Sequence, residues 1–333
     1  PYMGKNLIKQ KSKRLGSKNG HTKTIKPDEA FLLLNHALQL VENSSDVLLR
    51  YARYIEIKKK FGSNSSKKYK KEFGSTATSL INECWALYGA AVVLILTLSA
   101  MRKHESNTIL YEDAKLLLSG EIDTLRGVVH KTSGTITGKN TERQIVAEVQ
   151  EAINVITQLT EPMRKLSGSP YLLLRLTLTD SVQSGTTRCN ELATKSMYKI
   201  LDSFSTDAGY SGQLRPHMFR RFFSMLWAWR FEVGDLHYLS KLLYHNGYKF
   251  TTAYTEDEDV WEFMPENMKK FTHDVFDKML HGKKQIVGGF SRTIESYKKL
   301  IQSKVSLVNS DDISTYIDAV IERSGYIVTP AAD

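Results

Sequence analysis

The sequence predicts a mostly helical α+β fold with one small antiparallel sheet. Apolar residues recur at helical spacing over most of the 333 residues. One stretch near the middle is instead rich in Val and Ile and is interrupted by Ser, Gly and Asn, which is typical of a β-hairpin. Hydrophobic residues make up 41% of the chain and aromatic residues 10%, so the chain can bury a sizeable core.

Three helices are predicted in the first third of the chain. Pro27 and two following acids start a helix that runs to about residue 41, with a core face of Phe31, Leu34, Leu38 and Val41. A second helix covers Leu48–Ile57 and a third covers Ser79–Met101. The third contains the most apolar stretch, Trp85–Met101, which falls short of the about 20 residues of a membrane span. We therefore expect a buried core helix there.

The hairpin and the remaining helices follow in order. Thr124–Lys131 and Gln144–Val149 are the predicted strands. Helical periodicity returns at Val149–Leu166 and continues to the end of the chain, apart from loops near 203–212 and 245–250.

Basic residues outnumber acidic ones, 46 to 36, and the formal net charge of +10 favours a nucleic-acid partner over an acidic membrane surface. Residues 1–26 hold eight basic residues and no acid, which predicts a flexible basic arm or interdomain linker, or otherwise a solvated tail. Seven further lysines and no acid occur in 58–71, and 58–74 is predicted to be a lysine-rich surface loop. The candidate DNA-contacting residues are Lys11, Lys13, Arg14, Lys18, Lys23, Lys67, Lys68, Lys70 and Arg215.

Two cysteines, Cys84 and Cys189, are too few for a disulfide scaffold or a four-cysteine zinc site. We expect two reduced core thiols, with a single disulfide as the alternative. The N-terminus has no charged region followed by a short apolar segment, so a secretory signal is not predicted.

Three separate fragments carry side chains suited to phosphate chemistry. In the fragment 98–105, Arg102 ends the apolar helix and Glu105 lies three residues later, where it can orient the guanidinium. In the fragment 215–223, Pro216 favours a helix start, and the spacing of His217 and Arg220 puts them on one face.

The third fragment, 236–254, begins with an amphipathic helix that Asp235 can cap and that ends at His245. Asn246 and Gly247 turn the chain, and Tyr254 follows nine residues after His245. Each fragment alone is compatible with an ordinary helix surface.

Taken together, the ordered set resembles the tyrosine recombinase (phage integrase) family over roughly residues 26–260. That family's signature is an Arg at a helix end, a Lys in a β-hairpin, His-x-x-Arg, a later His or Trp, and a nucleophilic Tyr. The resemblance implies the family's catalytic fold and assigns these roles to Arg102, Lys131, His217, Arg220, His245 and Tyr254. The fragment 137–143 matches another form of the hairpin motif, so Lys139 is the alternative lysine.

The chain departs from the family pattern at positions that supply no catalytic group. Tyr244 stands where the family usually has Gly, and Arg221 where it often has His. The usual Thr-Gly near the first Arg is Ser99-Ala100 here.

The resemblance implies covalent catalysis that needs no metal or other cofactor. Tyr254 would attack a DNA phosphodiester and expel the 5′-hydroxyl, leaving a 3′-phosphotyrosyl intermediate. Arginines and a histidine would stabilise the phosphate charge, the hairpin lysine would protonate the leaving oxygen, and His217 would act as general base or phosphate donor. Glu105 would hold Arg102 in place.

The resemblance also implies an assembly. Residues 27–266 would form the catalytic domain, and 267–333 a helical extension that is exchanged between protomers. The family's separate N-terminal DNA-binding domain has no counterpart in the 26 residues before the catalytic region. The expected partners are two double-stranded recombination sites bound by a homotetramer, with a monomer when free and no membrane. The expected location is the cytoplasm, on the nucleoid, in a bacterium or encoded by a mobile element.

Two other functions stay open. A type IB topoisomerase or telomere resolvase would use similar groups and the same covalent intermediate. A non-catalytic DNA-binding protein could share the fold.

Overall fold

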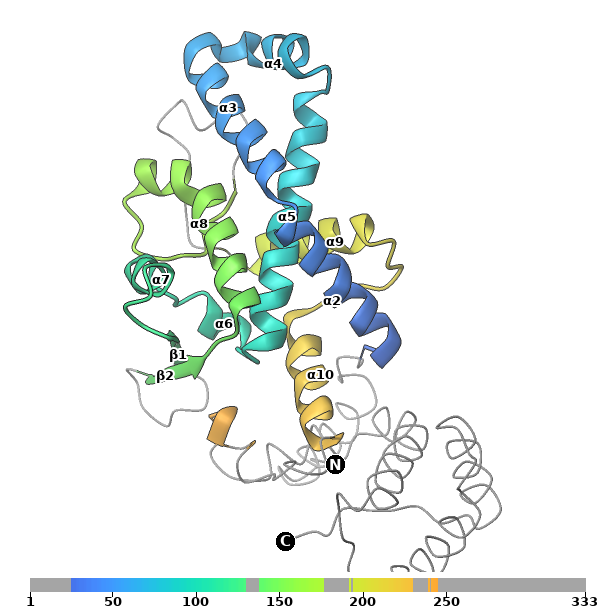
Figure 1. Ribbon diagram of the computed structural model, residues 1–333, viewed down its shortest axis with the longest axis vertical. Coiled ribbons are helices and arrows are strands. Elements are labelled where there is room, and N and C mark those ends of the chain that lie inside the picture. The colour runs from blue at the N-terminus through green and yellow to red at the C-terminus, as the bar shows by residue number, and fades with distance from the viewer. Residues whose placement is uncertain are drawn as a thin grey trace, which may run out of the picture. The chain divides into compact units, whose positions relative to one another are not determined.

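The computed structural model describes residues 25–129, 138–176, 192, 194–229, 239 and 241–244. Its helices and strands follow one another as shown in Figure 1. They are α2 (Pro27–Glu42), α3 (Ser45–Phe61), η1 (Gly62–Asn64), α4 (Ser65–Phe73), α5 (Ala77–Leu98), α6 (Lys103–Ser106), α7 (Tyr111–Leu118), β1 (Thr124–Val129), β2 (Lys139–Gln144), α8 (Ala147–Ser167), α9 (Thr194–Asp207) and α10 (Pro216–Trp229). The protein is mostly helical with a two-stranded antiparallel sheet, which confirms the predicted fold class.

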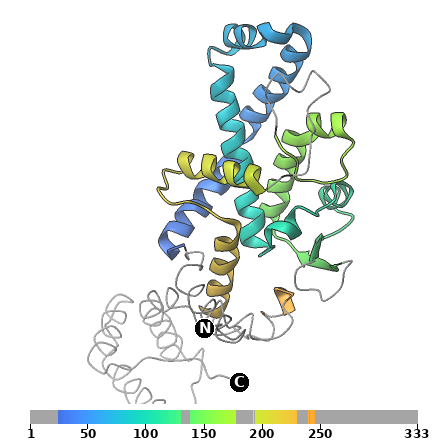
Figure 2. The same cartoon turned by 180° about the vertical axis from the view of Figure 1, so that it is seen from behind.

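Helix α5 is the central element, and α2, α8 and α9 pack around it (Figures 1 and 2). The Thr76 side chain caps its start by accepting a 3.1 Å hydrogen bond from the Ser79 backbone N–H. Among the described residues, α5 alone is long and apolar enough to cross a membrane, and 78% of its apolar window is buried inside the protein. The prediction of a buried core helix is confirmed.

Cys84 lies in α5 as a buried free thiol. Burial raises the pKa of this thiol to about 12. A reduced core thiol was expected at this position; Cys189 lies outside the described residues.

Helix α2 has its predicted bounds to within one residue, but its predicted core face was only partly right: Val41 is buried, Leu34 and Leu38 are half-buried, and Phe31 is exposed. The buried residues are Ala30, Leu33, Ala37 and Val41. Phe31 is 48% exposed, although its ring meets that of Phe222 edge-on at 5.6 Å. The small side chains of Ala30 and Ala37 allow α2 to lie close to α5. Close packing of the helices, and not the hydrophobicity of the side chains alone, therefore decides which face is buried.

The lysine-rich segment 58–74 is not a loop as predicted. It contains the last turn of α3, the short 3₁₀ helix η1 and all of α4. Gly74 ends α4 in the left-handed conformation with φ 73°, which favours glycine. The segment is therefore a helical hairpin at the start of α5.

The hairpin was predicted at the right place, but its second strand was not. Strand β2 is Lys139–Gln144, and α8 has already begun by Ala147. In the register, Thr124 lies opposite Gln144 and Val129 opposite Lys139. A Cβ at Gly127 would lie 3.1 Å from the Cγ of Glu105, so glycine allows the sheet to approach α6 closely.

The later helices also differ from the prediction in part. Helix α8 agrees with the predicted 149–166 stretch, and α10 begins at Pro216 as expected. The loop expected near 203–212 begins only after Asp207, where α9 ends. The loop expected near 245–250 lies outside the described residues.

The chain divides into two compact units. The first comprises residues 1–226 and 235–255, and the second 227–234 and 256–333. Almost all described residues belong to the first unit. The predicted N-terminal arm and C-terminal extension lie outside the described residues.

Candidate catalytic site

The corner after α5 carries the first predicted arginine. Helix α5 ends at Leu98, and Ala100 adopts a left-handed backbone conformation with φ 51°. Arg102 then precedes α6 in an extended conformation. Arg102 is partly exposed at this corner.

Glu105 is fully buried beneath this corner. One carboxylate oxygen accepts hydrogen bonds from the Thr141 hydroxyl at 2.7 Å and from Nη2 of Arg143 at 2.8 Å. The other accepts a 3.1 Å bond from the backbone N–H of Arg102. Glu105 therefore positions Arg102 through a hydrogen bond to its backbone. The sequence had predicted that Glu105 orients the Arg102 guanidinium.

Burial alone would raise the pKa of Glu105. The positive charge of Arg143 and the hydrogen bonds from Arg143, Thr141 and Arg102 outweigh that effect, and the pKa lies below its ordinary value. Glu105 is thus an anion that is held by strand β2.

Arg143 is the residue that sequence reasoning missed. It is buried with Glu105, and its Nη1 donates a 2.7 Å hydrogen bond to the carbonyl oxygen of Leu242. Its guanidinium also lies 5.1 Å from the ring centroid of Tyr244. The available signal was the Glu-Arg pair that ends the second hairpin motif, at residues 142 and 143.

Tyr244 joins the same strand through its hydroxyl. That hydroxyl donates to the carbonyl oxygen of Glu142 at 2.7 Å and accepts from the Glu142 backbone N–H at 2.8 Å. Lys139, the alternative hairpin lysine, is exposed at the start of β2, with its Nζ 5.7 Å from the Tyr244 ring centroid. Residues 242–244, which directly precede His245, are therefore fixed to β2.

Arg220 connects the remaining fragments. Its guanidinium is fully buried, and it donates one hydrogen bond to the carbonyl oxygen of Ala100 and a second, at 2.6 Å, to that of Leu243. Helix α10 also carries His217, which is exposed although it lies only three residues earlier. Arg220 thus ties together the corner before Arg102, helix α10 and the segment before His245.

The two positive-φ residues in this region occupy positions where the resembled family usually has glycine. Ala100 has φ 51° and Tyr244 has φ 52°. Left-handed conformations favour glycine because it lacks a Cβ. This chain adopts that conformation with Ala and Tyr.

The other predicted site residues are located as follows. Arg215 donates a 2.8 Å hydrogen bond to Gln213 and stacks 4.5 Å from the ring centroid of Tyr198. Lys67, Lys68 and Lys70 are exposed on α4. Outside the described residues lie Lys131, His245, Tyr254, Lys11, Lys13, Arg14, Lys18 and Lys23.

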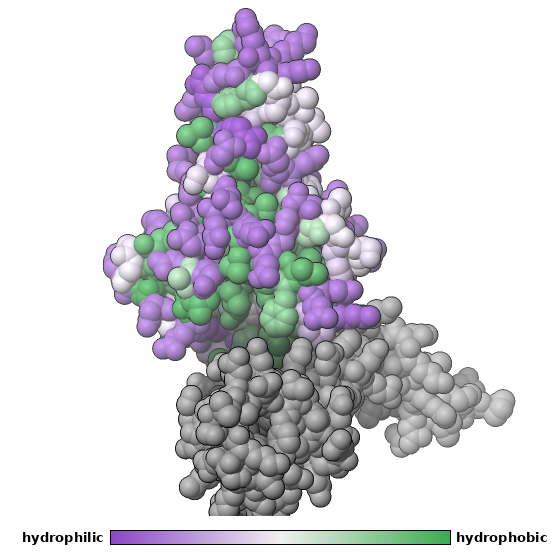
Figure 3. All heavy atoms as spheres, turned by 45° about the vertical axis from the view of Figure 1, so that its right-hand side comes forward, coloured by the Kyte–Doolittle hydropathy of each residue, from purple (hydrophilic) through white to green (hydrophobic). Residues whose placement is uncertain are grey.

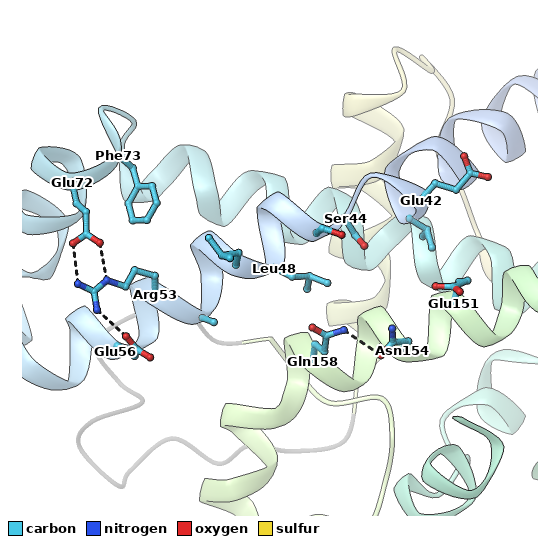
Figure 4. Close-up of a pocket in the computed structure, with 14 residues that line it drawn as sticks. Glu42, Ser44, Leu48, Arg53, Glu56, Glu72, Phe73, Glu151, Asn154 and Gln158 are labelled. Atoms are coloured by element: carbon cyan, nitrogen blue, oxygen red, sulfur yellow. Dashed lines mark hydrogen bonds and ion pairs between the residues drawn. The ribbon is translucent and has the colours of Figure 1, made fainter. Parts of the chain in front are cut away.

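A groove of about 740 Å³ lies elsewhere, between the end of α2, α3, α4 and α8 (Figure 4). None of the candidate catalytic residues lines it. Its charged lining is Arg53 and the four acids Glu42, Glu56, Glu72 and Glu151. An acidic groove repels phosphate, so the Arg220 cluster is the better candidate for phosphate chemistry despite the size of the groove.

No protein-family model and no curated protein matches the sequence. Among solved structures, the chain is similar to one described as the crystal structure of XerA recombinase, with 16% sequence identity. The match covers 79% of this chain and 91% of that chain, at a TM-score of 0.38. At this TM-score the family stays a prediction from the sequence motifs.

Proposed function

We propose that this protein is a site-specific DNA recombinase or integrase that cleaves and rejoins DNA through a 3′-phosphotyrosyl intermediate at Tyr254. The observation that carries the proposal is the pair of hydrogen bonds from Arg220 to the carbonyl oxygens of Ala100 and Leu243. Three fragments chosen from the sequence for their chemistry meet at one guanidinium. If these residues were unrelated parts of ordinary helix surfaces, there would be no reason for the three fragments to meet.

The hairpin adds a fourth fragment to this cluster. Arg143 of β2 binds both Glu105 and the carbonyl oxygen of Leu242. The Glu105 carboxylate in turn holds the backbone of Arg102. These buried bonds supply preorganisation, which a site needs if its arginines are to stabilise a phosphate transition state without rearranging.

In the proposed reaction, the Tyr254 oxygen attacks the phosphorus and the bond to the 5′-oxygen breaks. The tyrosine proton passes to His217, and the hairpin lysine, Lys131 or Lys139, gives a proton to the leaving oxygen. Arg102 and His245 stabilise the charge on the non-bridging oxygens, and the buried Arg220 holds the corner before Arg102 and the segment before His245 in place. Attack by a 5′-hydroxyl of a second duplex reverses the chemistry and joins new strands, with a Holliday junction between the two exchanges.

The decisive experiment is covalent capture. The purified chain is incubated with a library of nicked duplexes with randomised cores, and protein–DNA adducts are separated on a denaturing gel. We expect an adduct whose DNA-linked peptide contains Tyr254, and no adduct from the Tyr254→Phe variant. If the parent chain binds duplex DNA but forms no adduct, it is a DNA-binding protein without this activity.

A second assay distinguishes a recombinase from a type IB topoisomerase. Captured sequences are placed as a pair on one supercoiled plasmid. A recombinase exchanges strands between the two sites, whereas a type IB topoisomerase relaxes the plasmid without exchange.

A further inference from the structure

The hairpin of α3 and α4 forms a basic end of the described chain, at the N-terminal end of α5 (Figure 1). Figure 3 shows mostly hydrophilic residues at this end. Six of its seven lysines are exposed: Lys59, Lys60, Lys67, Lys68, Lys70 and Lys71. We call this surface the lysine tip.

The lysine tip is a built structure. Tyr54 of α3 meets Tyr69 of α4 edge-on at 5.4 Å, and Tyr69 stacks on Phe73 at 4.8 Å. Tyr54 and Tyr69 are both buried. These rings hold the two helices together, so the backbone positions that carry the lysines are fixed relative to one another.

The acids of the hairpin do not neutralise these lysines. Glu72 accepts from Nε of Arg53 at 2.7 Å, and Glu56 pairs with the same guanidinium at 2.9 Å. Within the described part of the chain, none of the six exposed lysines forms an ion pair. The tip therefore keeps its excess positive charge.

A cleft of about 540 Å³ opens between the two helices at this end. Lys60 lines it from α3, and Lys68 and Lys71 line it from α4. Phe61 is 37% exposed at the cleft, with Nζ of Lys60 and Lys68 at 5.5 and 5.2 Å from its ring centroid. Arg53, Glu56 and Glu72 line the same cleft, and both carboxylates pair with the Arg53 guanidinium. The three lysines therefore supply the excess positive charge of this cleft.

Helix stability does not explain all of these lysines. Lys59 and Lys60 lie in the last turn of α3 and Lys70 and Lys71 in the last turn of α4, where the helix dipole favours cations. Lys67 and Lys68, in contrast, lie near the start of α4, where no acid occurs in the first turn and the dipole disfavours cations. Their positive charge opposes the helix dipole, which indicates a use in binding.

We propose that the lysine tip binds the phosphate backbone of duplex DNA, as a contact separate from the catalytic cluster. The choice of DNA rests on the function proposed above. Helix α5 has 22 residues and is about 33 Å long, and the Arg220 cluster adjoins its other end. That length is about one turn of B-DNA, roughly 34 Å, so a duplex longer than one turn has the reach to contact both ends.

The test is the salt dependence of DNA binding by the full chain. The tip variant is Lys60→Gln/Lys68→Gln/Lys71→Gln, which keeps side-chain length and helix propensity. The matched control is Lys115→Gln/Lys165→Gln/Lys199→Gln, which removes the same charge from α7, α8 and α9; in the parent, Lys115 and Lys165 pair with Glu112 and Glu161. Binding to a fluorescein-labelled 30-base-pair duplex is followed by anisotropy over a range of potassium chloride concentrations.

For the tip variant we expect the slope of log K against log salt to become shallower by about 2 to 3, because each lost phosphate contact contributes roughly 0.9. Affinity near physiological salt should fall about tenfold or more. The control should keep the parent slope to within about one contact. Equal slopes for the tip variant and the control would overturn the proposal, and so would a tip variant that changes only self-association without DNA.

Adduct formation at saturating protein separates this proposal from the proposed function. If the parent forms the Tyr254 adduct and the tip variant keeps the parent slope, the proposed recombinase function is supported and the proposed role of the lysine tip is refuted. If the tip variant has a shallower slope but the parent forms no adduct, the role of the lysine tip is supported and the recombinase function is refuted.

Discussion

Glu105 is the residue on which the candidate site depends most directly for its shape. Its carboxylate is buried and joins α6 to β2 through Arg143. Replacing Glu105 by Gln removes the charge while keeping the volume, and leaves the Arg143 cation buried without its counter-ion. We expect a loss of about 1 to 3 kcal/mol in the free energy of unfolding at neutral pH, measured by urea titration.

The surface pair Lys115–Glu112 provides the control. Its side chains are 48% and 71% exposed, so Glu112→Gln should leave the free energy of unfolding nearly unchanged. A similar loss in both variants would show that the burial of the Glu105 pair has no energetic consequence.

The pH dependence of Glu105→Gln follows from the lowered pKa of Glu105. Because the folded pKa lies below the unfolded one, the unfolded chain binds the proton more readily, and the charged pair stabilises the fold fully above the unfolded pKa. This contribution is lost as pH falls through the folded pKa. The stability difference between parent and Glu105→Gln should therefore shrink below about pH 4.5, the ordinary carboxyl value. A difference that stays constant between pH 7 and pH 3 would contradict the assignment.

Ala100 allows a matched test of backbone conformation. Ala100 and Ala90 are both fully buried, but Ala100 has φ 51° whereas Ala90 lies inside α5. Replacing either by Gly removes one methyl group. Glycine relieves about 1 kcal/mol of left-handed strain at position 100 and costs about 1 kcal/mol of helix propensity at position 90. We expect Ala100→Gly to be more stable than Ala90→Gly by about 2 kcal/mol in thermal or urea unfolding; equal stabilities would argue against strain at Ala100.

At the same scale, the sequence predicts Arg102, His217 and Arg220 as site residues from residue type and local spacing. It does not identify the partner of Glu105. The Glu105–Arg143 contact spans 38 residues along the chain, and it depends on how β2 packs on α6. Local periodicity carries no information about a contact of that kind.

At the scale of elements, the close approach of α5 and α9 depends on Gly89. A Cβ there would lie 2.5 Å from Cβ of Phe204 and 2.6 Å from the carbonyl oxygen of Ile200. Gly89→Ala should therefore destabilise the protein by about 1 to 3 kcal/mol, although Ala is the better helix former by about 1 kcal/mol. Thr78→Ala at an exposed position of α5 is the control, and it should be neutral or slightly stabilising. A Gly89→Ala variant that is more stable than the parent would show that the two helices can separate.

Elements with a strong apolar period were predicted well, and polar ones were not. The bounds of α2, α5 and α8 lie within a few residues of the prediction because each helix is rich in apolar residues, which lie on one face in α8 and on almost all sides in α5. Helix α4 was missed because its Lys-rich sequence buries only Ser65 and Tyr69. Strand β2 was shifted because its own residues are polar and those that follow, at 145 and 146, are apolar.

At the scale of the whole molecule, the candidate site and the lysine tip both belong to one compact unit, which comprises residues 1–226 and 235–255. Helix α5 supplies the rigid connection between them. The second unit contains the acidic run 256–266, with six acids and no base, and the segment 267–333. We therefore propose different partners for the two units: DNA for the first, and a basic protein surface for the acidic run, which DNA would repel.

We propose that 267–333 is exchanged between protomers, as the family resemblance suggests. A chain that ends at Glu266 should keep the cooperative unfolding of the first unit and the salt dependence that the lysine tip confers. It should lose cooperative binding to paired DNA sites, which sedimentation or native gels report as a loss of species larger than one protomer per site. Retention of cooperative assembly by the shortened chain would refute the exchange, because the contacts between protomers would then lie within residues 1–266. If unfolding also changed, the Glu105→Gln pH signature would show whether the first unit is still intact.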